Sequence, residues 1–131
     1  MFGVNVFMCL NASESDPARM LSLMTFRPEI ETLLDDFKQR LEALYGERLI
    51  EVVLFGSVAR GEDTPESDVD VLVVLRGPVD HYAESEPLSK IMVDLMAEYG
   101  EFVTPVVLSA KEFQRQEWPL LRNVRQEGIS L

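Results

Sequence analysis

Hydrophobic residues recur along this chain with two different spacings, and the spacing changes several times after Pro28. Between Pro28 and Gly46 they stand three or four residues apart, which places them on one helical face. Proline suits the first turn of a helix and glycine suits its end. We therefore predict an amphipathic helix whose buried face carries Ile30, Leu33, Leu34, Phe37, Leu41 and Leu44.

Three short apolar runs predict β-strands. They are LIEVVLF at residues 49–55, DVDVLVVL at residues 68–75 and FVTPVVL at residues 102–108. The first two runs are apolar at nearly every position, which is typical of strands buried on both faces. Pro105 cannot donate a ladder hydrogen bond, so the third run is predicted to be an edge strand or to contain a bulge.

Helical segments are predicted between and after these strands. Residues 57–60 form a short turn between two glycines, and a helix over residues 86–99 ends at Gly100. Ser109 is expected to cap a terminal helical region that runs to about residue 126, with an interruption near Pro119. The second helix carries a stripe that we expect in the core, namely Leu88, Ile91, Met92, Leu95, Met96 and Tyr99. The fold class is α/β (α+β), with about three strands flanked by helices.

The composition fits one small domain. The chain has 131 residues, of which 47% are hydrophobic, so it can bury a core of its own. We expect residues 1–24 to be a disordered extension and residues 25–131 to form a single domain. The single cysteine, Cys9, cannot form an internal disulfide, and the apolar first stretch is too short to cross a bilayer. These features predict a cytoplasmic protein with no membrane association.

The charge narrows the choice of partners. The net charge is −11, from 23 acidic and 12 basic residues, so the field around the protein repels long nucleic acids. A compact nucleotide that arrives with magnesium, or a protein with a basic face, suits such a field better. Solubility alone is the alternative explanation of the acidity.

Candidate chemistry lies between Leu54 and Leu75, where the sequence reads LFGSVARGEDTPESDVDVLVVL. Gly56 can adopt a backbone conformation closed to other residues and lets a phosphate approach the main chain. Ser57 begins a helical turn whose free N–H groups, together with its hydroxyl, can hold phosphate oxygens. Arg60, one turn further, can add a charge-assisted contact.

Two aspartates open the second predicted strand. Asp68 and Asp70 are one residue apart, so their side chains leave the same face, about 6.5–7 Å apart along the strand. Two carboxylates beside apolar residues repel each other unless a cation joins them, and oxygen ligands of this kind select magnesium or manganese. A lone Gly-Ser or Asp-x-Asp is usually only a turn or a strand end. The two together, in this order, favour a site that binds phosphate and a divalent metal.

This segment resembles the signature of the nucleotidyltransferase superfamily related to DNA polymerase beta. The motif GSVARG at residues 56–61 and the chain length resemble those of minimal nucleotidyltransferases, which occur as antitoxins paired with HEPN-domain ribonuclease toxins. The motif match covers residues 54–75, and the order of elements agrees from about residue 28 to residue 108.

The resemblance implies a nucleotidyltransferase fold with a small mixed sheet. It also implies transfer of a nucleotidyl group, often adenylyl, from a nucleoside triphosphate such as ATP to a hydroxyl of a protein or small molecule. Mg²⁺ (or Mn²⁺) would be the cofactor, and a HEPN-type toxin would be the protein partner. Carried over by position, Gly56, Ser57 and Arg60 would bind the nucleotide, and Asp68 and Asp70 would be the catalytic metal ligands.

The chain departs from the family pattern at a third carboxylate, which is expected on the later strand beside the first two. Residues 102–108 contain no acid; Glu101 is the nearest candidate, and Asp94 lies on the polar side of its helix. Two interpretations therefore stay open. The chain is an active nucleotidyltransferase, or it keeps the fold and works as a nucleotide-binding or toxin-docking module.

Other residues are expected to carry no chemistry. His81, the only histidine, is predicted in a loop beside Tyr82 without a second ligand, so a zinc site is not expected. Trp118 is predicted to be a core residue, with a partner-binding patch together with Leu120 and Leu121 as the alternative. The acceptor, the preferred base and the formation of a homo-oligomer are left open by the sequence.

Overall fold

The computed structural model describes residues 28–131 except residues 65, 116 and 117. The expected extension at residues 1–24, including Cys9, lies outside the described residues. Helices and strands alternate as the hydrophobic pattern predicts. In chain order they are α3 (Pro28–Tyr45), η2 (Gly46–Arg48), β1 (Leu49–Phe55), α4 (Gly56–Arg60), β2 (Val69–Leu75), α5 (His81–Tyr99), β3 (Val103–Ser109), α6 (Ala110–Arg115), α7 (Pro119–Glu127) and β4 (Ile129–Ser130).

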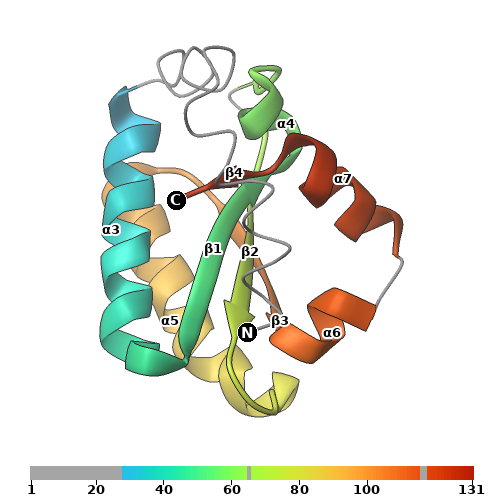
Figure 1. Ribbon diagram of the computed structural model, residues 1–131. Helices are drawn as coiled ribbons and strands as arrows, with labels where there is room; N and C mark the ends of the chain where they lie inside the picture. Colours follow the sequence, from blue (N-terminus) through green and yellow to red (C-terminus); the bar gives the residue numbers. More distant parts are fainter. Residues whose placement is uncertain (1–27, 65, 116–117) are drawn as a thin grey trace.

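The described strands form one mixed sheet in the order β3-β2-β1-β4 (Figure 1). β1 runs antiparallel to both β2 and β4, whereas β2 and β3 are parallel. The predicted mixed α/β fold is confirmed, and β3 is an edge strand, as Pro105 predicts. The fourth strand was missed because two residues are too short a run to produce an alternation pattern.

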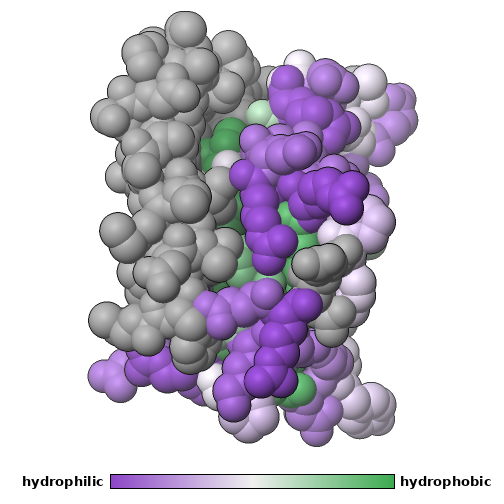
Figure 2. All heavy atoms as spheres, turned by 45° about the vertical axis from the view of Figure 1, so that its right-hand side comes forward, coloured by the Kyte–Doolittle hydropathy of each residue, from purple (hydrophilic) through white to green (hydrophobic). Residues whose placement is uncertain are grey.

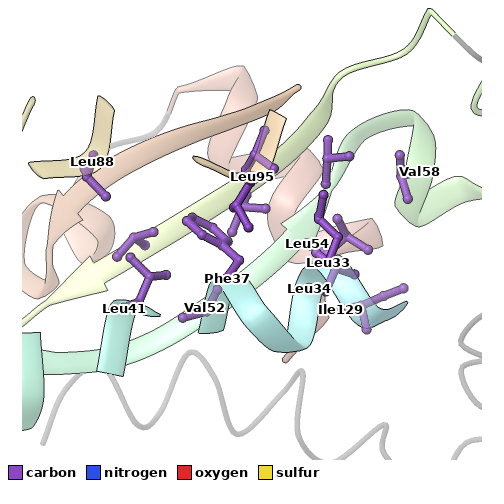
Figure 3. Packing of buried hydrophobic residues seen from close by; sticks show 14 of the residues in the cluster. Leu33, Leu34, Phe37, Leu41, Val52, Leu54, Val58, Leu88, Leu95 and Ile129 are labelled. Atoms are coloured by element: carbon purple, nitrogen blue, oxygen red, sulfur yellow. The ribbon is translucent and has the colours of Figure 1, made fainter. Parts of the chain in front are cut away.

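Helices cover both faces of the sheet. α3 and α5 lie on one side and α6 and α7 on the other (Figure 1). On the first side, Leu33 and Phe37 of α3 meet Val52 and Leu54 of β1, as Figure 3 shows. On the second side, Phe113, Leu121 and Val124 pack on strand residues that point the other way, namely Val53, Leu72 and Val74. β1 and β2 are therefore central strands with apolar contacts on both faces.

Polar residues dominate the outside of the helical layer. Figure 2 brings the α6 and α7 side of the molecule forward, and hydrophilic residues cover most of its described surface around a smaller hydrophobic region. This agrees with the net charge of −11. Among the described residues, no helix combines the length and the apolar composition that a membrane span needs.

α5 begins earlier than the sequence pattern suggests. The predicted loop at His81 and Tyr82 is wrong, because the carboxylate of Asp80 accepts hydrogen bonds from the N–H groups of Tyr82 (3.1 Å) and Ala83 (3.2 Å) and starts the helix there. The expected Ser109 cap is confirmed. Its hydroxyl accepts from the N–H of Glu112, and the Glu112 carboxylate accepts from the N–H of Ser109, both at 3.1 Å.

Three residues that the sequence pattern places in the core are exposed. Leu44 is 41% exposed because the buried line at the end of α3 runs through Leu41 and Tyr45. Met96 is 46% exposed because the buried line of α5 runs through Leu88 and Leu95. Trp118 is 43% exposed because it stands in extended conformation just before α7, outside the stripe that Leu121 and Val124 bury. The 3.6-residue helical period does not apply to a residue that stands before the helix, so the hydrophobic pattern cannot predict the burial of Trp118.

We expect the core under α3 to dominate stability. Leu41→Ala should lower the free energy of unfolding by about 2–5 kcal/mol, because Leu41 is fully buried and its loss leaves a cavity. Leu44→Ala is the matched control, since Leu44 is 41% exposed on the same helix, and its effect should stay within about 0.5 kcal/mol. Urea unfolding measures both, and equal losses would contradict this account of the core.

Candidate functional site

The end of β1 and the start of β2 meet at one point of the sheet. The antiparallel register pairs Phe55 with Asp70, so Gly56 follows directly beside the Asp70 carboxylate. A Cβ on Gly56 would overlap Asp70 Oδ2 and would lie 3.2 Å from Asp70 Cγ. Gly56 also has a φ of +80°, which residues with a side chain rarely adopt. The backbone conformation therefore favours glycine, and a side chain here would also have to displace the Asp70 carboxylate.

α4 is fixed in place by its apolar side. Val58 and Ala59 are buried in the core cluster beneath α3, and Figure 3 shows Val58 directed into that cluster. Ser57 is half-buried and Arg60 is exposed. The first N–H groups of a helix lack intrahelical acceptors. The Gly56–Ser57 bend therefore presents main-chain donors next to the acid pair, which consists of Asp68 and Asp70. The structure thus brings Gly56 and Ser57 to Asp70.

Asp68 and Asp70 stand on either side of Val69, whose side chain is buried in the core cluster beneath α3. Asp68 is exposed just before β2, whereas Asp70 lies inside the strand and is half-buried. Asp70 shares its face with Leu72 and Val74, which pack against α6 and α7. Asp70 therefore stands on the face that α6 and α7 cover, close enough to Asp68 to feel its negative charge.

The electrostatics of the pair favour a cation. Burial raises the pKa of Asp70, the negative charge of Asp68 raises it further, and the Arg60 guanidinium works in the opposite direction. A group whose charged form is disfavoured in this way gains from a nearby positive ion. Two carboxylates are also the oxygen ligands that magnesium and manganese prefer. The pair fits one divalent cation.

Arg60 reaches two other acids. Its Nη1 lies 2.9 Å from Glu127 Oε1, and its Nε lies 3.5 Å from Glu62 Oε2. Glu127 is the last residue of α7, so this ion pair joins α4 to the C-terminal part of the chain. Sequence reasoning missed Glu127, because it is remote from the motif and no local pattern marks it. The guanidinium expected to bind phosphate thus lies between two carboxylates in this structure.

β3 borders the acid pair on the side opposite α4. The parallel register places Thr104 opposite Asp70. The Val69 N–H donates to the Phe102 carbonyl (2.8 Å), which brings Phe102 beside Asp68 just as Thr104 stands beside Asp70. Phe102 is 48% exposed. Asp94 instead forms an ion pair with Arg40 (3.4 Å) on the α3 and α5 side. Within the described part of the chain, no group of three or more acidic, histidine or cysteine residues could hold a metal.

Comparison of the amino-acid sequence with known proteins identifies relatives of this chain. A family model described as a nucleotidyltransferase domain matches residues 30–127. "Putative protein adenylyltransferase MJ0604" of Methanocaldococcus jannaschii is 34% identical over 99 residues, which cover 75% of this chain and 93% of that protein. "Putative protein adenylyltransferase MJ0141" of the same organism is 32% identical over 79 residues, or 60% of this chain and 79% of that protein.

Solved structures share the fold at lower identity. A toxin–antitoxin crystallised with AMP-PNP superposes with a TM-score of 0.53 at 20% identity, over 72% of this chain and 69% of that chain. A mutant of the toxin–antitoxin MntA-HpeT superposes with a TM-score of 0.52 at 18% identity, over the same shares of 72% and 69%. At this level of identity the likeness establishes the fold.

The contact between Gly56 and Asp70 can be tested by stability. Gly56→Ala should cost roughly 1–2 kcal/mol for the left-handed backbone and roughly 1–3 kcal/mol more for the overlap with Asp70. Gly61→Ala is the matched control, because Gly61 has a φ of +73° and open space where a Cβ would stand. Urea unfolding should show a clearly larger loss for Gly56→Ala. Equal losses would mean that the close approach to Asp70 costs nothing.

The raised pKa of Asp70 predicts a pH-dependent stability. In the metal-free chain at neutral pH, Asp70→Asn should raise the melting temperature, because folding disfavours the charged carboxylate. The advantage should shrink as the pH falls through the native pKa of Asp70 toward the unfolded value of about 3.9, since the wild-type carboxyl is then neutral. Asp35→Asn, an exposed change of the same charge on α3, should give no such gain. Thermal unfolding over pH measures both, and an equal gain from Asp35→Asn would point to net charge alone.

Proposed function

Because the chain belongs to the nucleotidyltransferase domain family, we propose that it transfers the nucleotidyl group of a triphosphate, ATP in the first place, to a hydroxyl. The observation that carries this proposal is the close approach of Gly56 to Asp70, which brings the glycine–serine bend beside an acidic side chain. The names of the relatives as protein adenylyltransferases support an adenylyl group and a protein acceptor. AMP-PNP in a structural neighbour supports a triphosphate ligand.

The roles divide along the site. Main-chain N–H groups of the Gly56–Ser57 bend and the Ser57 hydroxyl hold phosphate oxygens, and Arg60 adds positive charge beside them. Asp68 and Asp70 hold Mg²⁺ or Mn²⁺, which when bound neutralises phosphate charge and polarises a phosphoryl oxygen. The acidic surface repels a free triphosphate, so the magnesium complex is the form that the site receives.

Catalysis by these residues is mainly positioning. The bend fixes the phosphate chain so that an acceptor oxygen can approach the α-phosphorus in line with the leaving group. A bond forms between that oxygen and the α-phosphorus, the bond from the α-phosphorus to the bridging oxygen breaks, and pyrophosphate departs. The acceptor's hydroxyl proton is released to solvent. Donors placed at the bend stabilise the charge that develops on the phosphates.

Labelled nucleotides test the reaction. With magnesium and a cell lysate as the source of acceptors, ATP labelled at the α-phosphate should give a labelled acceptor, and ATP labelled at the γ-phosphate should not. Asp70→Ala should remove at least 99% of the label, or about two orders of magnitude, because it removes a metal ligand and transition-state stabilisation. Asp35→Ala, exposed and distant on α3, should retain it. Full labelling by the Asp70→Ala variant would contradict the proposed site.

A second function is favoured by one observation, which is that no third acid joins Asp68 and Asp70 among the described residues. In this alternative, the chain keeps the fold and neutralises a HEPN-type toxin by contact. Both structural neighbours described above are toxin–antitoxins. If co-expression with the toxin shows that Asp68→Ala and Asp70→Ala still neutralise it, docking is favoured. If these variants bind the toxin but fail to neutralise it, transfer is favoured.

A further inference from the structure

The residues around the acid pair set a limit on how many cations the site can bind. Sites that use two divalent ions hold them about 3.5–4 Å apart, and each ion needs several oxygen ligands. Two like dications this close repel strongly, so the surrounding ligands must supply enough negative charge to offset them. Asp68 and Asp70 supply two carboxylates from the chain, and the described residues add no third.

The sheet register shows which strand position beside Asp70 could carry a third ligand. Asp70 has one strand neighbour on each side, which are Phe55 of β1 and Thr104 of β3. Phe55 is buried in the core beneath α6 and α7, and Gly56 beyond it has no side chain. Thr104, which is half-buried, is therefore the position beside Asp70 from which a further side chain would share its face.

Within β3, the face that Thr104 shares with Asp70 carries no negative charge. Thr104 offers a neutral hydroxyl, and its neighbours on the same face, Phe102 and Val106, are apolar. The positive charge of Arg60 lies on the other side and already acts on Asp70. Near this side of the acid pair, a second dication would therefore find a hydroxyl and apolar groups.

We propose that the site holds a single divalent cation, shared by Asp68, Asp70 and the phosphates of the triphosphate, and that Thr104 is the residue that leaves no place for a second. This inference rests on the proposed function, because the triphosphate completes the ligands of the one ion. Replacing Thr104 by an acid adds the missing charge in register with Asp70, and it should create the second binding place.

Equilibrium dialysis with Mn²⁺ and the α,β-methylene analogue of ATP, which resists transfer, measures this directly. Both compartments contain the same free ion and free ion–nucleotide complex, so the excess in the protein compartment gives bound manganese and bound nucleotide. The wild-type chain should bind one Mn²⁺ per nucleotide, and Thr104→Asp should bind two. Thr104→Asn is the matched control, of the same size and without the charge, and should bind one.

The outcomes separate this inference from the proposed function. A wild-type ratio of two, or a folded Thr104→Asp variant that stays at one, overturns the single-ion proposal while nucleotide binding stands. Thermal unfolding checks that the variant is folded; if it is not, Thr104→Glu takes its place, and a wild-type ratio of two remains decisive. A wild-type chain that takes up no nucleotide overturns the proposed function, and the single-ion proposal with it.

Discussion

The contact between Gly56 and the Asp70 carboxylate is the constraint on which the site depends. It exists because β1 and β2 pair antiparallel with Phe55 opposite Asp70, so the bend after β1 turns over the first residues of β2. The pairing is in turn held by apolar contacts on both faces of the two strands. A shift of the register by one residue would send Asp70 to the opposite face and separate the acids from the bend.

The same contact concentrates negative charge in a protein that is already acidic. Asp70 lies partly buried beside Asp68, and its raised pKa expresses that cost. Arg60 offsets part of it and is itself held by Glu127 at the end of α7. The C-terminal part of the chain therefore contacts the site region in two ways. Glu127 forms an ion pair with Arg60, and β4, which follows α7, pairs with β1 at Val53 and Leu54. The charge environment of Asp70 therefore depends on the packing of α7, through Arg60 and Glu127.

The two sides of the acid pair differ in chemistry. On the β1 side, the Gly56–Ser57 bend offers main-chain donors suited to phosphate oxygens. On the β3 side, Phe102 and Thr104 offer an exposed ring and a hydroxyl. The first side carries the features on which the proposed phosphate binding rests, and the second carries the residues on which the single-ion proposal rests.

The sequence by itself determined the alternation of helices and strands, the edge position of β3, and the place of Asp70 near the start of a buried strand, because hydrophobic period and turn residues are local signals. The predicted strand began one residue too early, since Asp68 stands just before β2. Only the tertiary structure decided that Thr104 stands opposite Asp70, that Glu127 holds Arg60 and that a short β4 completes the sheet. It also decided that Trp118 and Met96 are exposed. These features depend on strand register and on contacts between residues far apart in the chain, which no local pattern encodes.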